Sequence, residues 1–378
     1  MKSAAIQILH TADNHLGISY AQYPDRVRDR LVEERFQALE RLVETANSRG
    51  AHFLVVAGDL FDKTSVGKNL VERTVKILAN FEGVHVLVLA GNHDFCEGGD
   101  SKLWRTFRET AEGTCVIPLV AQAVKDFEVE DARIRFYACP CPSKRGSNHA
   151  IGWVGDADKG DGVLHIGIAH GNVEGLGLDA DQRYFNMSEQ DLRATGVDVW
   201  LLGHIHVPAP PAATTGRPLF FMSGTHTPDS VKCTHPGHAW WIELGMDGAC
   251  RHEQLTSGGV RFLRLKRELR NSDDIAALSS KCSLLDAANT ILDLQLSGRL
   301  RAEEFTDLKA CLGTIHEKFL YVSQDLEGIA RVLDSIAISS KFPERTLPHA
   351  LLNALLADES HPGDTHLALE IIESLQRP

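Results

Sequence analysis

Phe53-Leu54-Val55-Val56-Ala57-Gly58-Asp59-Leu60-Phe61-Asp62 is the stretch that decides the fold of this chain. Its first five residues are all apolar, which is typical of a short strand that is buried on both faces of a parallel sheet. The strand runs directly into Gly58 and Asp59, so a carboxylate stands at its carboxyl end. In open α/β sheets, ligands collect at that end of the strands. The stretch therefore predicts a layered α/β core with its chemistry at one edge of a sheet.

Four further motifs also follow apolar runs directly: Asp13-Asn14-His15, Gly91-Asn92-His93-Asp94, His170-Gly171 and Gly203-His204-Ile205-His206. Strands are predicted at Ile6–His10, Phe53–Ala57, Val84–Ala90, Val163–Ala169, Val197–Leu202, Leu219–Met222 and Ala239–Leu244, with helices between the first three. Because each motif stands at the end of a strand, we expect these residues to converge on one edge of the core.

The converging residues are Asp, His and Asn without Cys, a set that suits manganese, iron or zinc. The potential ligands are Asp13, His15, Asp59, Asn92, His170, His204 and His206. One tetrahedral zinc needs about four ligands, so seven favour two ions. A carboxylate shared between them, for which Asp59 is the candidate, would bridge ions ~3.5–4 Å apart, the arrangement that clamps a phosphoryl oxygen and activates water.

His93 stands beside a candidate ligand and is expected to act in catalysis rather than in metal binding. Asp94 follows it and is expected to orient the His93 ring, as carboxylates orient catalytic imidazoles. Each motif alone is weak, because an isolated Asp-x-His is more often a surface loop and His-x-His on a strand is commonly structural. The prediction rests on five motifs in a fixed order at strand ends.

Taken together, the five motifs resemble those of the calcineurin-like metallophosphoesterases. The stretch from His10 to Gly17, the segment from Arg26 to Phe36, and Gly58–Asp62 resemble the SbcD type of DNA repair nuclease within that superfamily. Phe221-Met222-Ser223-Gly224-Thr225 and the later segment Gly237–Leu244 resemble it too. The resemblance implies a four-layer metallophosphoesterase sandwich followed by a small capping domain.

The resemblance also implies a role for each residue. Asp13, His15, Asp59 and His206 would hold the first metal ion, and Asp59, Asn92, His170 and His204 the second. His93 would stabilise the transition state or protonate the leaving oxygen. Members of the family use manganese, with iron, zinc or magnesium as alternatives here, and cleave DNA as exonucleases and endonucleases. They usually work with an SMC-like coiled-coil ATPase of the SbcC type, and a homodimer is a possible assembly.

The sequence predicts three regions, divided at Thr256-Ser257-Gly258-Gly259, the best candidate for a linker. Residues 1–257 form the expected nuclease domain, and residues 258–325 a βαβαβ capping domain. Residues 326–378 form a helical segment, with two short helices split by Ser360-His361-Pro362-Gly363. The apolar residues of these helices fall on helical faces, which suits docking to the ATPase or packing on the cap of the same chain.

Two groups of basic residues are candidates for contacts with DNA phosphates: Arg26, Arg28 and Arg30, and, at the expected domain junction, Arg264, Lys266 and Arg267. Such contacts would be salt-dependent and independent of DNA sequence. The alternative is a solvated charged face, because Asp25 and Asp29 are interleaved with the first group.

Composition limits the classes of protein to which the chain can belong. Of 378 residues, 43% are hydrophobic and 24% charged, which excludes disordered, collagen-like and coiled-coil classes. The formal net charge of −12 argues against a surface that binds nucleic acid everywhere, but not against a site where bound cations reverse the local charge. No apolar run approaches the ~20 residues of a membrane span, and the N-terminus lacks the apolar core of a signal peptide. We therefore expect a soluble cytoplasmic protein.

Two other functions fit parts of the sequence. The first is a phosphatase or cyclic-nucleotide phosphodiesterase that uses the same dinuclear site on a small substrate; the expected capping domain argues against it. The second is a non-enzymatic scaffold that docks an ATPase; the retention of all seven candidate ligands and His93 argues against it.

Overall fold

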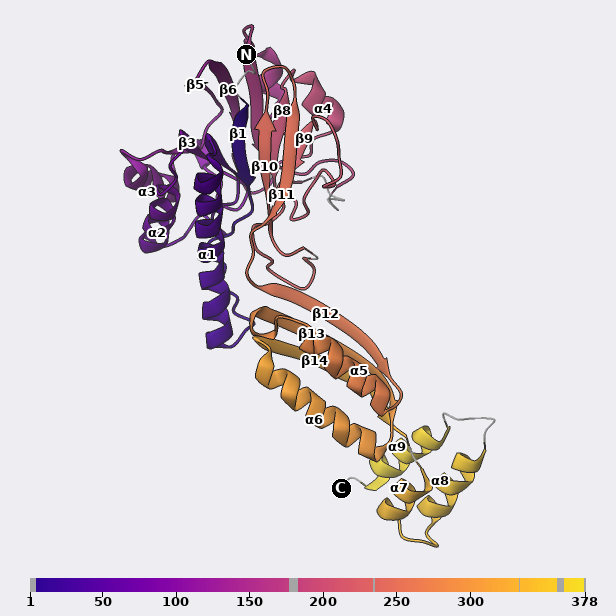
Figure 1. Ribbon diagram of the computed structural model, residues 1–378. Helices are drawn as coiled ribbons and strands as arrows, with labels where there is room; N and C mark the ends of the chain where they lie inside the picture. The colour runs from indigo at the N-terminus through magenta and orange to yellow at the C-terminus, as the bar shows by residue number, and fades with distance from the viewer. Residues whose placement is uncertain (1–4, 177–182, 234, 333, 359–363, 377–378) are drawn as a thin grey trace. The chain divides into compact units, whose positions relative to one another are not determined.

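The computed structural model describes residues 5–176, 183–233, 235–332, 334–358 and 364–376. The chain divides into two compact units, unit 1 up to Arg261 and unit 2 from Phe262. Unit 1 holds two sheets and unit 2 holds a third (Figure 1). Among the described residues, no helix combines the length and the apolar character that a membrane crossing requires.

The six-stranded sheet of unit 1 has the order β11-β10-β1-β2-β3-β4. The strands are β1 (Ile6–Thr11), β2 (Phe53–Ala57), β3 (His85–Leu89), β4 (Val116–Leu119), β10 (His238–Leu244) and β11 (Cys250–Thr256). The run from β1 to β4 is parallel, and β10 lies antiparallel to β1. The helices α1 (Asp25–Arg49), α2 (Lys68–Leu78) and α3 (Lys102–Ala111) pack on one face through a core that joins Phe36 and Val75 to Leu54 and Val88.

The five-stranded sheet of unit 1 has the order β5-β6-β7-β8-β9. Its strands are β5 (Ala123–Val129), β6 (Ala132–Cys139), β7 (Val163–His170), β8 (Val199–Gly203) and β9 (Phe220–Met222), with β6 to β9 parallel. A second core packs Val55 and Leu87 of one sheet against Phe136 and Ile168 of the other. A third core covers the outer face with α4 (Glu189–Ala194) and the 3-10 helix η2 (Gly152–Asp156). The predicted four-layer sandwich is confirmed.

All seven strands predicted for unit 1 are present, within two residues at either end. The strands β4, β5, β6 and β11 and the helix α3 were not predicted from the sequence. In β5, buried or half-buried residues alternate with exposed ones, so it lacks the continuous apolar run that marks a strand covered on both faces. The edge strand β11 is similarly polar. The missed strands are largely those with one open face or edge.

Unit 2 begins with the predicted alternation of strands and helices. It comprises β12 (Arg261–Leu269), α5 (Ser272–Ser283), the 3-10 helix η3 (Ala287–Asn289), β13 (Thr290–Leu300), α6 (Ala302–Lys318) and β14 (Tyr321–Arg331). The sheet order is β12-β13-β14, and its core joins Leu265 and Leu294 to Leu278 and Leu312 of the helices. Since β14 runs to Arg331, the expected domain end at residue 325 is too early, and the unit boundary lies at residue 261 rather than 257.

Three helices follow in unit 2: α7 (Ser335–Lys341), α8 (Leu347–Ala357) and α9 (Asp364–Gln376). Two of them correspond to the predicted pair, whereas α7 was not expected. The predicted break at Ser360–Gly363 lies outside the described residues. Ile338, Phe342 and Leu352 form a small core, so the residues just before the predicted pair belong to the same packed cluster.

Candidate metal centre

The carboxyl ends of β1, β2, β3, β7 and β8 carry the five motifs. Asp13 follows β1, Asp59 follows β2, Asn92 follows β3, His170 ends β7 and His204 follows β8. Because each of these strands is parallel to its neighbour within its sheet, the motifs meet at one end of the sandwich. The structure brings all seven candidate ligands to this edge.

The backbone at this edge is held in an unusual conformation. Asp13, His15, Asp59 and His204 have φ values of 53°, 43°, 52° and 102°, in the region that glycine favours. Hydrogen bonds hold it: the amide of Asp13 donates to the carbonyl of Gly58 at 3.1 Å, and that of His15 to the carbonyl of Asp59 at 2.9 Å. Strain of ~1–3 kcal/mol per residue persists only where surrounding structure imposes it, and it gathers at functional sites.

One group of candidate ligands consists of Asp13, His15 and His206. The Nε2 atoms of His15 and His206 lie 3.2 Å apart. The Oδ1 atom of Asp13 lies 3.7 Å from Nε2 of His206 and 4.0 Å from Nε2 of His15. One ligand atom from each of the three residues falls within 4.8 Å of the others, so the group can hold a metal ion.

The second group contains Asp59, Asn92, His170 and His204. Nε2 of His170 lies 3.3 Å from Oδ2 of Asp59 and 3.0 Å from Oδ1 of Asn92. Nδ1 of His204 lies 3.0 Å from the same Asn92 oxygen. Oδ2 of Asp59 is also 3.8 Å from Nε2 of His15, so this carboxylate faces both groups.

Three imidazoles are oriented by acceptors on their Nδ1 atoms. Nδ1 of His170 donates to the carbonyl of Ala57 at 2.8 Å, and Nδ1 of His93 lies 3.0 Å from the carbonyl of Asp62. Nδ1 of His206 lies 3.1 Å from Oδ2 of Asp229. A carbonyl or carboxylate oxygen accepts the Nδ1 proton, so in the neutral ring Nε2 carries the lone pair for a metal or a substrate.

The electrostatics favour cations. Burial opposes a charged His170, but attraction to the Asp59 carboxylate outweighs it and raises the pKa of His170 to about 9. Burial would raise the pKa of Asp59, yet the histidines around it, His170 foremost, hold it well below its usual range. Burial and then repulsion from His170 lower the pKa of His204 to about 3. A buried carboxylate that stays ionised and stabilises positive charge on its neighbours also attracts divalent ions.

The expected role of Asp94 is wrong. Its carboxylate accepts the amide protons of Gly91 at 2.7 Å and of Phe61 at 3.0 Å, while the carbonyl of Asp62 takes the His93 ring. Burial, followed by repulsion from Asp59, raises the pKa of Asp94 to about 7. Asp94 therefore fixes the two loops that carry Asp59 and Asn92 instead of orienting His93.

Three residues of the site were not predicted from the sequence. A cavity of about 310 Å³ opens over both groups, and its walls include Asp62, Tyr184 and Asp229. The Tyr184 ring lies 5.0 Å from that of His204. Asp229 comes shortly after β9, so its place beyond another strand of the same sheet was the available signal. Tyr184 lies in a loop far from any strand end, so the sequence offered no signal for it.

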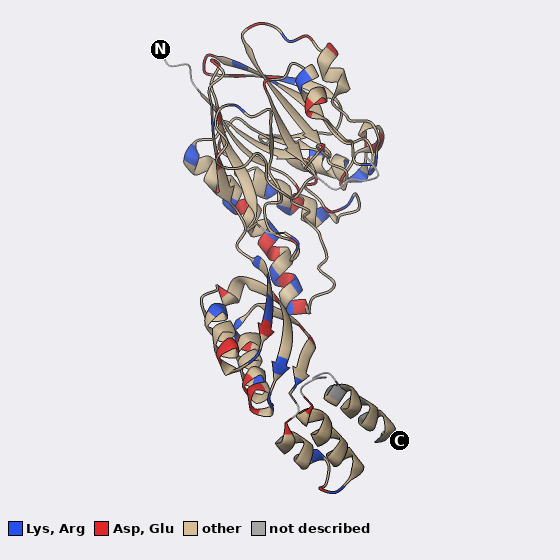
Figure 2. Cartoon of the chain, turned by 90° about the vertical axis from the view of Figure 1, so that its right-hand side faces the viewer, with Lys and Arg blue, Asp and Glu red and all other residues tan. Residues whose placement is uncertain are grey.

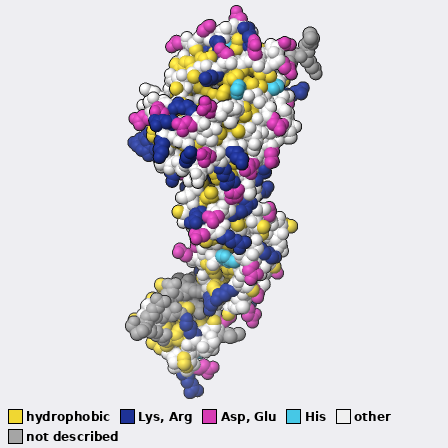
Figure 3. All heavy atoms as spheres, turned by 90° about the vertical axis from the view of Figure 1, so that its left-hand side faces the viewer, with side chains coloured by type: hydrophobic (Ala, Val, Ile, Leu, Met, Phe, Trp, Pro, Cys, Tyr) yellow, Lys and Arg dark blue, Asp and Glu magenta, His cyan; other side chains and the backbone are white. Residues whose placement is uncertain are grey.

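The first group of predicted DNA contacts lies on α1. Arg28 pairs with Asp25 at 3.1 Å and lies 3.5 Å from Asp29, and Arg30 pairs with Glu34 at 3.0 Å. Arg26 is exposed. Basic and acidic residues are interspersed over unit 1 (Figures 2 and 3), so this group matches the alternative of a solvated charged face.

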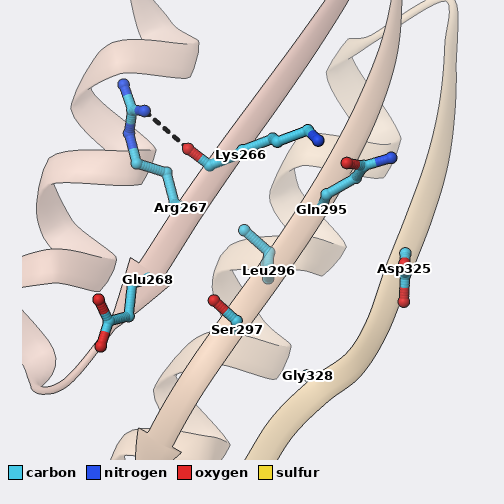
Figure 4. Close-up of a pocket in the computed structure, with 8 residues that line it drawn as sticks. All are labelled: Lys266, Arg267, Glu268, Gln295, Leu296, Ser297, Asp325 and Gly328. Atoms are coloured by element: carbon cyan, nitrogen blue, oxygen red, sulfur yellow. Dashed lines mark hydrogen bonds between the residues drawn. The ribbon is translucent and has the colours of Figure 1, made fainter.

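The second group lies on β12, and its members diverge. Arg264 pairs with Asp293 at 2.6 Å. Lys266 extends over the sheet toward Gln295, whereas Arg267 turns the other way and donates to the carbonyl of Lys266 (Figure 4). Consecutive strand residues point to opposite faces, which separates Lys266 from Arg267. Lys266 forms no ion pair with another described residue and lines an open pocket of about 350 Å³.

Comparisons with known proteins agree with this geometry. The sequence model of the calcineurin-like phosphoesterases matches residues 6–208. The chain is 28% identical over 213 residues to the uncharacterized metallophosphoesterase YhaO of Bacillus subtilis (strain 168), covering 53% of this chain and 48% of that protein. It is 26% identical over 213 residues to the DNA double-strand break repair protein Mre11 of Aeropyrum pernix, covering 53% and 49%.

A shorter match has a higher identity. Over 93 residues the chain is 39% identical to the SbcD component of the nuclease SbcCD of Escherichia coli (strain K12), which covers 24% of this chain and 21% of that protein. The matches to YhaO and to the Aeropyrum protein span about half the length of those relatives.

Proposed function

This chain belongs to the calcineurin-like phosphoesterase family, and on that premise we propose that it hydrolyses phosphodiester bonds of DNA with two divalent metal ions. The observation that carries the proposal is the place of Asp59, whose carboxylate lies 3.3 Å from His170 and 3.8 Å from His15. A carboxylate between two groups of nitrogen and oxygen donors is what a dinuclear centre requires.

The donor set fits two hard-to-borderline ions. Asp13, His15, Asp59 and His206 would hold one, and Asp59, Asn92, His170 and His204 the other; we favour manganese. When bound, the ions supply Lewis acidity, which generates a nucleophile from water and neutralises charge on the phosphoryl oxygens. The protein contributes oriented ligands, because Asp229 and the carbonyl of Ala57 fix the rings of His206 and His170.

His93 is assigned as the residue that stabilises the transition state or protonates the leaving oxygen. Its Nδ1 is engaged by the carbonyl of Asp62, and the residue lines the cavity, so Nε2 is the atom that can meet a substrate. His93 also lies close enough to His15 and Asp59 to be a ligand itself. The two roles differ in their effect on metal content, which makes them separable.

DNA as the substrate is supported by relatives whose names identify a component of a nuclease and a DNA break repair protein. Within unit 2, Lys266 is a cation available to a phosphate. The β12–β14 sheet with its two helices is assigned as a cap that restricts which DNA ends reach the metals.

An SMC-like coiled-coil ATPase is the proposed partner, and the C-terminal helices are its proposed docking site. Leu367, Ile371 and Leu375 of α9 are 58%, 51% and 81% exposed, and their spacing puts them on one face. Ala368 and Ile372 pack instead toward the core of Ile338, Phe342 and Leu352. The helix therefore has an inner apolar face that is covered and an outer one that is open, as expected of a helix that lies against a partner.

The test is hydrolysis of end-labelled linear DNA and of bis-p-nitrophenyl phosphate with manganese, magnesium or EDTA. We expect both substrates to be hydrolysed with manganese and neither with EDTA. Hydrolysis of the small diester alone would favour the small-substrate phosphodiesterase. Inertness toward both, with metal bound, would favour the scaffold.

A further inference from the structure

A second cavity, of about 360 Å³, lies at the same end of the sandwich. The loops that follow β3, β4 and β6 line it, and Phe185 contributes one wall. Since these loops leave the carboxyl ends of their strands, the cavity stands where α/β proteins bind ligands.

The two cavities share a wall. Tyr184 lines the metal cavity and its neighbour Phe185 lines the second one. The loop after β6 is bonded to this segment, because Gly146 donates to the carbonyl of Arg183 at 2.9 Å and accepts from the amide of Phe185 at 2.8 Å. The carbonyl of Lys144, in the same loop, lies 3.5 Å from Nδ2 of Asn92. A molecule that fills the second cavity is thus separated from the candidate metal ligands by one strip of chain.

The lining offers no fixed charge to a ligand. No Lys, Arg, Asp or Glu is among the described residues that line the cavity, so a phosphate or a carboxylate would find no counter-charge there. Val120, Cys141 and Phe185 supply apolar surface. An uncharged molecule with substantial apolar area is therefore favoured.

The lining also contains polar groups to which a ligand could form hydrogen bonds. The side-chain amides of Gln122 and Asn148 are exposed and make no hydrogen bond with other described residues, so a ligand in the cavity would have to replace their water. Nδ1 of His149 is buried without a hydrogen-bond partner, and Nε2 of the same ring lies 3.8 Å from Asp191. An aliphatic ligand would leave these groups unsatisfied, whereas a flat ring with donors and acceptors on its edge would pair with them.

We propose that this cavity binds an unpaired nucleobase of the DNA strand whose phosphodiester lies over the metal centre. The inference rests on the proposed DNA cleavage and specifies its substrate: a strand with at least one base outside the stack, such as single-stranded DNA or a frayed end. A base in a duplex has its hydrogen-bonding edge occupied and cannot enter such a pocket without being flipped out.

The test compares the binding of two labelled five-nucleotide strands, one of thymidines and one of abasic residues. Both carry phosphorothioate links, which resist hydrolysis, so binding can be measured without removing the metal from the protein. The strands have the same backbone charge, so phosphate contacts cancel and the ratio of their affinities reports the bases. Base contacts of this kind predict that the wild-type protein binds the thymidine strand roughly tenfold more tightly.

Ala121→Trp is the decisive variant, because Ala121 is exposed and lines the cavity, so an indole placed there would fill it. We expect the variant to bind both strands equally and to hydrolyse bis-p-nitrophenyl phosphate at the wild-type rate. Ala213→Trp is the matched control, an exposed loop alanine that lines neither cavity, and it should keep the tenfold ratio.

An unchanged ratio in Ala121→Trp, or no preference for bases in the wild-type protein, would overturn the inference. Failure of the proposed function would give a different result: DNA would stay intact with manganese while the small diester is cleaved. Binding discrimination that is present in wild type and lost in Ala121→Trp would support the cavity assignment in either case.

Discussion

Two regions of the molecule differ in how their side chains are held: the end of the unit 1 sandwich that carries the candidate metal ligands, called the edge below, and the exposed face of α9 formed by Leu367, Ile371 and Leu375. Asp13, Asp59 and His170 are at most 2% exposed, and their side chains contact acceptors, donors or charged groups that fix them. Leu367 and Ile371 are more than half exposed. The first region is specified by many mutual contacts, the second by the spacing of apolar residues along one helix.

The difference teaches where each region's function resides. A preorganised polar cluster is costly to build, since each buried group must be paired, and it persists where the chemistry uses it. An exposed apolar face costs little to build and acquires a role only from what covers it. Loss of a residue at the edge should therefore affect the reaction, and loss of a residue on the face should affect assembly.

The sharpest test of the edge is Asp59→Asn. Loss of the shared charge should abolish hydrolysis of bis-p-nitrophenyl phosphate and lower the manganese content, because both groups of ligands lose their common carboxylate. Metal content is measured on purified protein, with Asp131→Asn as an exposed control. Near-normal turnover at normal stoichiometry would show that Asp59 does not bridge two ions.

His93→Ala should separate catalysis from metal binding. We expect turnover to fall about 10²–10⁴-fold, the scale of a lost acid–base group, with manganese content near that of the wild type. His93 would be reassigned as a ligand if the variant lost metal along with activity.

Asp229→Asn should weaken the orientation of the proposed ligand His206 without removing it. The carboxylate lies 3.1 Å from Nδ1 of His206, and outer partners of this kind typically contribute about 10–100-fold to metal affinity. Activity should fall by a similar factor at low manganese and recover at high manganese, whereas Asp247→Asn, on an exposed turn, should change neither. A deficit that manganese does not relieve would contradict the orienting role.

The sequence predicted the edge better than its supports. Candidate ligands such as Asp13 and Asn92 follow apolar runs, and strand polarity alone brings such residues together. Tyr184 could not be predicted, because its contact with His204 depends on where its loop returns in three dimensions, whereas the position of Asp229 after β9 did offer a signal. The role expected of Asp94 was wrong for the same reason: adjacency in the chain to His93 says little about which atoms a buried carboxylate reaches.

The buried His10 of unit 1 should make the protein less stable in mild acid. His10 is buried, and burial lowers its pKa to about 4 despite bonds to the carbonyls of Leu202 and Phe221. Between about pH 6.5 and 4 the unfolded chain binds a proton that the folded one does not, so the free energy of unfolding falls as the pH drops through this window.

All five tryptophans lie in unit 1, so their fluorescence follows the unfolding of that unit alone. We expect the midpoint of urea unfolding to fall less between pH 6.5 and 4.5 in His10→Gln than in the wild type. His316→Gln, at an exposed position of unit 2, is the control. An equal fall in both variants would mean that His10 does not contribute to the acid sensitivity.

The smallest effect on the reaction is expected at the other end of the comparison. Replacing both Leu367 and Ile371 by Lys charges the open face of α9 but leaves Ala368 and Ile372, which pack inward, in place. Hydrolysis of the small diester should stay within about twofold of the wild type, because no residue of the edge changes. Co-purification with an SMC-like ATPase of the same organism should be lost, since two lysines cannot be buried against an apolar partner without desolvation.

Ser374→Lys adds a charge to the same helix at an exposed polar position and should leave co-purification intact. The face would have no docking role if the double variant still bound the ATPase as the wild type does. A loss of helical signal with loss of binding would instead assign these side chains to the packing of α7–α9.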